Sequence, residues 1–100
     1  MIFTKVEEKE APSKDLFWFK VIVIGENKKD EKKVFEEGKR IHWVLRKLQV
    51  LGFRVNNGLP VKADFSYYFF IVECPLKNKD RTREAIKEVA EAGEGLYQEY

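Results

Sequence analysis

Residues 16–24 read Leu-Phe-Trp-Phe-Lys-Val-Ile-Val-Ile, and this stretch decides the fold. β-branched and aromatic side chains occupy both of its alternating faces, which is typical of a central strand buried on two sides. Gly25 ends the run. A second stretch of the same kind extends from Phe65 to Cys74 and is stopped by Pro75. We therefore predict two long strands at the centre of a sheet.

The segment after the first of these strands has the periodicity of an amphipathic helix. Asn27 or Asp30 can cap its first turn, and Gly52 provides a stop after about Leu51. At about 100° per residue, one narrow stripe should face the core. That stripe contains Val34, Gly38, Ile41, Leu45 and Leu48.

The remaining segments predict shorter elements. Residues 2–6 alternate weakly and suggest a short strand, whereas residues 7–15 read as a solvated connector. Asn56-Asn57-Gly58 is a strong turn signal, so residues 53–55 and 59–61 should form a hairpin, with Pro60 restricting the return to an edge. A last helix should begin at residues 78–82 and run toward Tyr100, with Gly93 and Gly95 weakening it.

These elements predict one α+β domain over residues 1–100, in the order (β)βαββα. An antiparallel or mixed sheet with both helices on one face is the economical arrangement. The order invites comparison with RNA-recognition domains, but residues 65–72 lack the glycine of that motif, and no closing strand is predicted after the last helix. We therefore assign no family. The sheet face without helices must be closed by the N-terminal segment, a partner or a ligand.

Composition restricts the setting. The longest apolar run is about eight residues, far short of the roughly 20 that span a bilayer, and the N-terminus lacks a secretory pattern. A single cysteine, Cys74, excludes an internal disulfide and fits a reducing cytoplasmic location. The abundance of Lys and Glu resembles compositions enriched in thermophiles.

Charge is segregated along the chain. Between Gly38 and Ala63 there are six basic residues and no acidic one. The rest of the chain then holds 13 basic residues against all 17 acidic ones. A surface of one sign concentrates and orients oppositely charged ligands. The six basic residues are Lys39, Arg40, Arg46, Lys47, Arg54 and Lys62.

Trp43 is the most informative residue of this segment. Nine helical steps from Val34 place it opposite the core stripe, between Lys39, Arg46 and Lys47. Bases of single-stranded nucleic acids stack on aromatic rings for roughly 1–3 kcal/mol each while cations neutralise phosphates. The alternative is that Trp43 packs under the N-terminal arm or in a dimer interface, where Trp is also enriched.

The sheet offers a second aromatic surface. Trp18 and Lys20 share one face of the first central strand, and we expect that face to be the open one. On the later strand the polarity of Tyr68 and Ser66 favours that set as outward-facing. Such a surface would be a stacking platform for bases. The alternative is that these are ordinary core aromatics.

Arg54 and Lys62 flank the predicted turn and could follow a phosphate backbone, or simply form a hairpin tip.

Catalytic signals are weak. His42 is the only histidine and sits on the flank of the helix stripe without an acid in the following turn. Cys74 precedes a proline at a strand end, where burial is the default. The segment Gly25-Glu26-Asn27-Lys28-Lys29 lacks the ending of a phosphate-binding loop. We expect no enzyme activity, metal or cofactor.

The leading hypothesis is a non-catalytic domain that binds single-stranded DNA or RNA with weak sequence preference. The alternative is a protein interaction module, most simply a homodimer. Predicted nucleic-acid contacts are Trp18, Lys20, Lys39, Arg40, Trp43, Arg46, Lys47, Arg54, Lys62 and Tyr68.

Overall fold

A computed structural model describes residues 1–47, 54–55, 61–62, 66–93 and 96–99. At residues 54–55, 61–62 and 96–99 only the backbone is described. Its elements follow the chain as β1 (Ile2–Glu10), β2 (Leu16–Gly25), α1 (Glu31–Lys47), β3 (Arg54–Val55), β4 (Val61–Lys62), β5 (Ser66–Pro75), α2 (Lys79–Glu91) and β6 (Leu96–Glu99). Short 3-10 turns, η1 (Lys28–Asp30) and η3 (Leu76–Asn78), precede the two helices.

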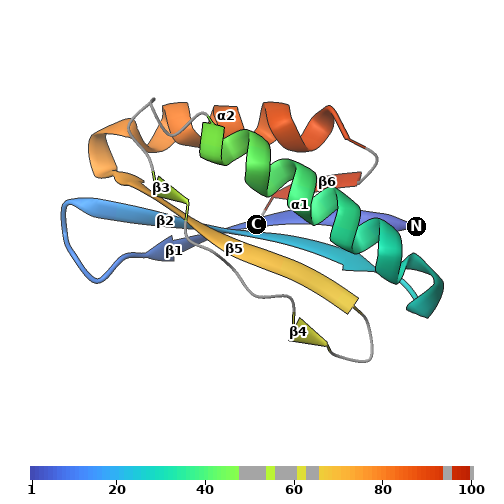
Figure 1. The fold of residues 1–100 in the computed structure, drawn as a ribbon. Helices are drawn as coiled ribbons and strands as arrows, with labels where there is room; N and C mark the ends of the chain where they lie inside the picture. Colours follow the sequence, from blue (N-terminus) through green and yellow to red (C-terminus); the bar gives the residue numbers. More distant parts are fainter. Residues whose placement is uncertain (48–53, 56–60, 63–65, 94–95, 100) are drawn as a thin grey trace.

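The strands form one sheet in the order β3-β5-β2-β1-β6, with β4 also paired to β5. All pairs are antiparallel except that of β1 with β6, which is parallel. Both helices lie on the same face of this sheet (Figure 1). The predicted α+β class is confirmed, and so is the placement of the two helices.

The core lies between the sheet and the helices. Phe19, Val21 and Val23 of β2 face the helices and are completely buried. They pack with buried residues of the helix stripe, which confirms its predicted face. From that stripe Val34, Gly38, Ile41 and Leu45 are buried. Leu48 and the predicted helix stop at residues 51–52 lie outside the described residues.

β1 is longer than its sequence pattern predicts. Residues 7–10, which were predicted to belong to a connector at residues 7–15, lie in this strand. β1 pairs with β2 along its whole length. The charged run Glu7–Glu10 hid the strand, because charged residues have low strand propensity. Ladder pairing with Phe17, Trp18, Phe19 and Lys20 outweighs that propensity.

The predicted hairpin at residues 53–61 is wrong. β3 and β4 are both antiparallel to β5 and therefore run in the same direction along one edge of it. The chain reverses instead between Lys62 and Ser66, which are paired across β4 and β5. β3 and β4 therefore pair with the long apolar strand β5 and not with each other. The turn residues 56–58 themselves lie outside the described residues.

The last helix ends earlier than predicted. α2 stops at Glu91, and residues 96–99 form the closing strand β6 that the sequence did not reveal. After α2, Gly93 packs closely against the side chains of Glu37 and Arg40 of α1, so a Cβ there would collide with both. Among the helices described, none is both long and apolar enough to cross a bilayer.

Candidate functional site

Trp43 lies on the side of α1 that faces away from the core, as predicted. It is 57% exposed, the most exposed aromatic residue of the described part of the chain. The guanidinium carbon of Arg46 lies 5.6 Å from the centroid of the indole ring. This separation is within the range of a cation–π interaction. The result is a solvent-facing aromatic plane with a cation at its edge.

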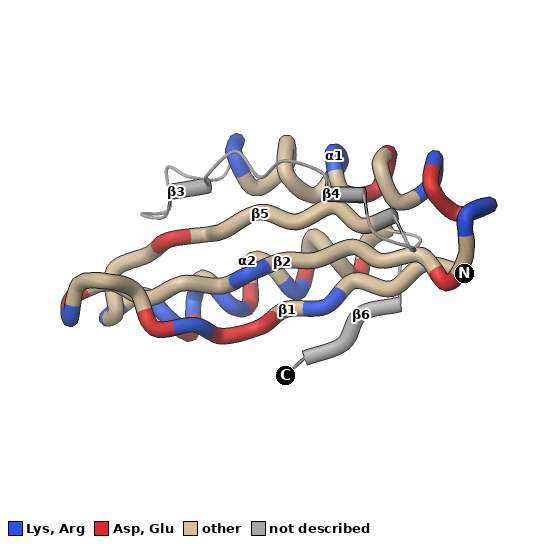
Figure 2. Tube along the Cα trace, turned by 90° about the horizontal axis from the view of Figure 1, so that it is seen from below, with Lys and Arg blue, Asp and Glu red and all other residues tan. Residues whose placement is uncertain are grey.

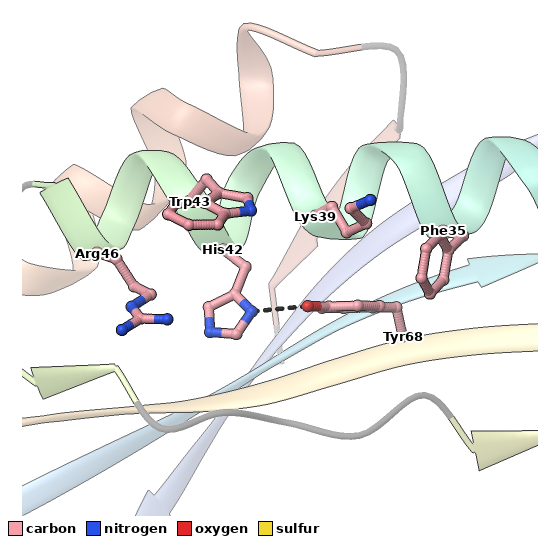
Figure 3. Close-up of a pocket in the computed structure, with 6 residues that line it drawn as sticks. All are labelled: Phe35, Lys39, His42, Trp43, Arg46 and Tyr68. Atoms are coloured by element: carbon pink, nitrogen blue, oxygen red, sulfur yellow. Dashed lines mark hydrogen bonds between the residues drawn. The ribbon is translucent and has the colours of Figure 1, made fainter.

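A pocket of about 280 Å³ lies beside Trp43. Five of its residues come from α1 and one, Tyr68, comes from β5 (Figure 3). The α1 residues recur every three or four positions, so the helix places them on one flank. The lining consists of Phe35, Lys39, His42, Trp43, Arg46 and Tyr68.

The inner wall of the pocket is ordered by buried contacts. The Tyr68 hydroxyl lies 2.6 Å from Nδ1 of His42, as Figure 3 shows. The His42 ring stacks on Phe70, with centroids 4.6 Å apart and planes 10° from parallel. Burial raises the pKa of Tyr68, so its hydroxyl stays protonated at neutral pH. These contacts fix a neutral, polar group at the inner end of an aromatic pocket.

The outer wall is formed by Phe35 and Lys39. Phe35 is 43% exposed and meets the ring of Tyr68 edge to face, with centroids 5.9 Å apart. The Lys39 ammonium lies 5.0 Å from the centroid of the Phe35 ring. Lys39 and Arg46 thus each bring a positive charge to an exposed aromatic ring. Among the described residues that line the pocket, none is acidic.

Arg40 is separated from this site. It turns to the other flank of α1, where it pairs with Glu37 and donates from a guanidinium nitrogen to the backbone oxygen of Val89, 2.8 Å away. This contact ties α1 to the C-terminal turns of α2. Arg40 thus has a structural contact, and the structure does not bring it to the Trp43 pocket.

The sheet residues divide differently from the prediction. Trp18 and Lys20 face away from the helices, which confirms that their face is the one without helical cover. Tyr68 is a correction: it faces α1, and only 7% of it is exposed. The outward set of β5 includes Tyr67, Phe69 and Ile71, which are half-buried. Trp18 and Lys20 therefore belong to a different surface from Trp43.

Lys47, Arg54 and Lys62 are the other predicted contacts. Lys47 is exposed at the end of α1, close in sequence to Trp43 and Arg46. Arg54 and Lys62 belong to β3 and β4, at the edge of β5, and only their backbones are described. The structure thus brings Lys39, Trp43, Arg46 and Tyr68 together.

Phe35 and His42 were missed as pocket residues. Their spacing carried a signal, because positions 35, 39, 42, 43 and 46 fall on one helical flank. The sequence pattern placed His42 on the flank of the core stripe and singled out neither residue as part of a pocket. Comparison with protein-family models, curated proteins and solved structures finds no match to this chain.

Proposed function

We propose that this chain is a non-catalytic domain that binds single-stranded nucleic acid at the Trp43 pocket. The observation that carries the proposal is the exposed indole of Trp43 between Lys39 and Arg46, beside a pocket lined with aromatic rings. Such a combination suits a ligand that joins a flat ring to a negative charge, as every nucleotide does.

In this mechanism one base stacks on Trp43 or Phe35 at the mouth of the pocket. Its neighbouring phosphates approach Lys39, Arg46 and Lys47, which displace condensed counterions. The Tyr68 hydroxyl, held 2.6 Å from His42, is available to hydrogen-bond the edge of an inserted base. One such polar contact orients a base but gives only weak sequence preference.

A single strand is favoured over a duplex for a geometric reason. The exposed rings and the pocket are reached only by an unstacked base, and bases inside a duplex are already stacked on their neighbours. The cation–aromatic pairs lie along one flank of a single helix, so they follow one strand.

Fluorescence anisotropy of a labelled oligothymidine tests the proposal. We expect binding at about 50 mM salt, with log Kd changing by about 2 per decade of salt if three phosphates are engaged. Trp43→Ala should weaken binding by about tenfold to a hundredfold, the equivalent of one lost stacking contact. Absence of binding by the unmodified protein at this salt concentration contradicts the proposal.

Two lysine variants provide a matched comparison. Lys39→Ala should weaken binding and reduce the salt slope by about 0.7, since it removes one phosphate contact. Lys77→Ala removes an exposed cation on η3, outside the pocket, and should leave both quantities unchanged. Equal effects of the two variants would mean that only net charge matters, which contradicts a site at the pocket.

A further inference from the structure

One flank of α1 carries cations and aromatic rings in alternation. Figure 3 shows Lys39 between Phe35 and Trp43 along the helix. Helical geometry places a further cation, Lys32, one turn before Phe35 on the same flank. We call this set of exposed side chains the α1 row. In chain order it consists of Lys32, Phe35, Lys39, Trp43 and Arg46.

The α1 row presents one sign of charge. Neither Lys32 nor Lys39 forms an ion pair with a residue of the described chain. The acidic side chains of the same turns, Glu36 and Glu37, line a cavity on the other flank of α1. Figure 2 shows that acidic residues are confined to the N-terminal half of α1, whereas basic residues continue to its end. The row therefore attracts a ligand with repeated negative charges.

The rise of the helix sets the spacing of the row. At about 1.5 Å per residue, the eight residues from Phe35 to Trp43 span about 12 Å. Lys32, Lys39 and Arg46 follow one another at intervals of seven residues, or about 10 Å. Because a straight helix drifts by only about 20° in seven residues, these three cations lie nearly on one line.

A stacked strand does not fit this spacing. Stacked nucleotides advance by about 3.4 Å and turn by about 35° per step, so bases about 12 Å apart point more than about 100° away from each other. Both rings of the row, however, line the same pocket. An unstacked strand advances by up to about twice the stacked spacing, so two of its steps cover the distance between the rings.

We propose that the α1 row binds three consecutive nucleotides of an unstacked strand. The outer two bases lie on Phe35 and Trp43, and the middle base lies at the pocket of about 280 Å³ between them. The cations are also about two steps apart, so they meet every second phosphate. This inference rests on the proposed function and adds to it a footprint and a path along α1.

The need for an unstacked strand sets the class of sequence. Adenine runs stack strongly on themselves and lose that stacking when they bind the row. Thymine runs stack weakly and have a flexible backbone. Sequence preferences of single-strand binders arise from such differences without base-specific hydrogen bonds. The row should therefore favour pyrimidine runs over adenine runs.

Competition against a labelled oligothymidine measures the footprint. The competitors are 5′-phosphorylated oligothymidines of increasing length. We expect affinity to rise about tenfold from two to three nucleotides, because the third base reaches the second ring. Each further nucleotide should add less than about threefold, and a hexamer of adenine should bind about threefold to tenfold more weakly than one of thymine. Affinity that grows evenly with length, or tighter binding of the adenine hexamer, overturns the inference.

Two phenylalanine variants test whether both rings are used at once. Phe35→Leu keeps an apolar side chain but removes the ring, so it should weaken the thymine hexamer about tenfold and the dinucleotide less than about twofold. Phe17→Leu removes a half-buried ring of β2, outside the row, whose centroid also has an ammonium nearby, that of Lys79 at 4.3 Å. It should leave both affinities unchanged. Equal losses for the hexamer and the dinucleotide in Phe35→Leu overturn the footprint.

Neighbouring lysines give a test that does not depend on packing. Lys32→Ala removes the first cation of the row and should lower the salt slope for the hexamer by about 0.7. Lys33→Ala makes the same charge change at a side chain that lines the cavity on the opposite flank, and should leave the slope unchanged. Equal slopes for the two variants overturn the path along the row, while weaker binding by Trp43→Ala would still support the proposed function. Absence of binding at every length overturns both.

Discussion

Gly38 shows how one residue sets the distance between α1 and the sheet. A Cβ at this position would lie 2.4 Å from Cγ of Tyr68, far inside van der Waals contact. Tyr68 cannot easily move, because its hydroxyl is engaged with His42 and its ring is buried. The absence of a side chain at Gly38 therefore permits the helix to pack directly over the inner wall of the Trp43 pocket.

We predict that Gly38→Ala lowers the free energy of unfolding by about 1–3 kcal/mol, the usual cost of overpacking a core. Alanine in a helix is normally favoured over glycine by about 1 kcal/mol, so the sign of the change is diagnostic. Urea denaturation measures it, with the exposed Glu36→Ala as a control for helix propensity. A Gly38→Ala protein as stable as the unmodified chain would contradict the close approach.

Single residues also show where sequence reasoning succeeds and fails. The outward position of Trp43 was predictable, because a helix rotates each side chain by a nearly constant angle. The inward position of Tyr68 was not. Both faces of β5 carry aromatic residues, so alternation alone could not tell which one lies under α1.

At the scale of elements, α1 and α2 are joined by a charged contact. Arg40 donates to the Val89 backbone oxygen and pairs with Glu37, which is buried. The carbonyls near the end of a helix carry the negative end of its dipole, so a cation is favourable there.

We predict that Arg40→Met lowers the free energy of unfolding by about 1–3 kcal/mol, as expected for losing hydrogen bonds made by a charged group. Binding of oligothymidine should be unchanged, because Arg40 lies on the flank of α1 away from the pocket. Thermal unfolding and anisotropy on the same preparation check both parts. Weaker binding with unchanged stability would show instead that Arg40 belongs to the binding surface.

β1 is joined to α2 through Glu8, which pairs with Arg83 and lies 3.6 Å from the Lys79 ammonium. The hydrogen bond from Arg83 is the main cause that lowers the pKa of Glu8 below its ordinary value of 4.5. A lowered pKa in the folded state stabilises the fold above the ordinary value, and this contribution disappears as the pH falls through the folded-state value.

We therefore predict that Glu8→Gln destabilises the protein at pH 7 by less than about 1 kcal/mol, since the pair is partly exposed. The difference between variant and unmodified protein should shrink at an acidic pH below the ordinary value of 4.5, as the carboxyl becomes protonated in the folded state as well. Urea denaturation at the two pH values measures this. A difference that persists in acid would show that charge is not its source.

The pairing of the short strands resisted prediction for a common reason: β3 and β4 overlap the strands predicted at residues 53–55 and 59–61 but pair with β5, and β6 was not predicted. β3, β4 and β6 are two to four residues long and exist because a long neighbour supplies their pairing partners. Such pairing is non-local and leaves little trace in local composition. The long strands and α1 were predictable because each carries its own periodic pattern.

At the scale of the molecule, the two layers present two different surfaces. The helix layer carries the Trp43 pocket with its cations, and the opposite sheet face carries apolar rows with both signs of charge. The segregation of charge along the sequence predicted the first surface. The second depended on register across three strands, which the sequence alone could not supply.

The most direct test of the central claim uses Trp43 as the only tryptophan, in a Trp18→Phe protein titrated with oligothymidine. Exposed Trp43 should give a red emission that is quenched as the oligonucleotide binds. The converse Trp43→Phe protein, which reports from Trp18 on the other face, should not respond. A blue Trp43 emission, or one unchanged at saturating oligothymidine, would contradict the account.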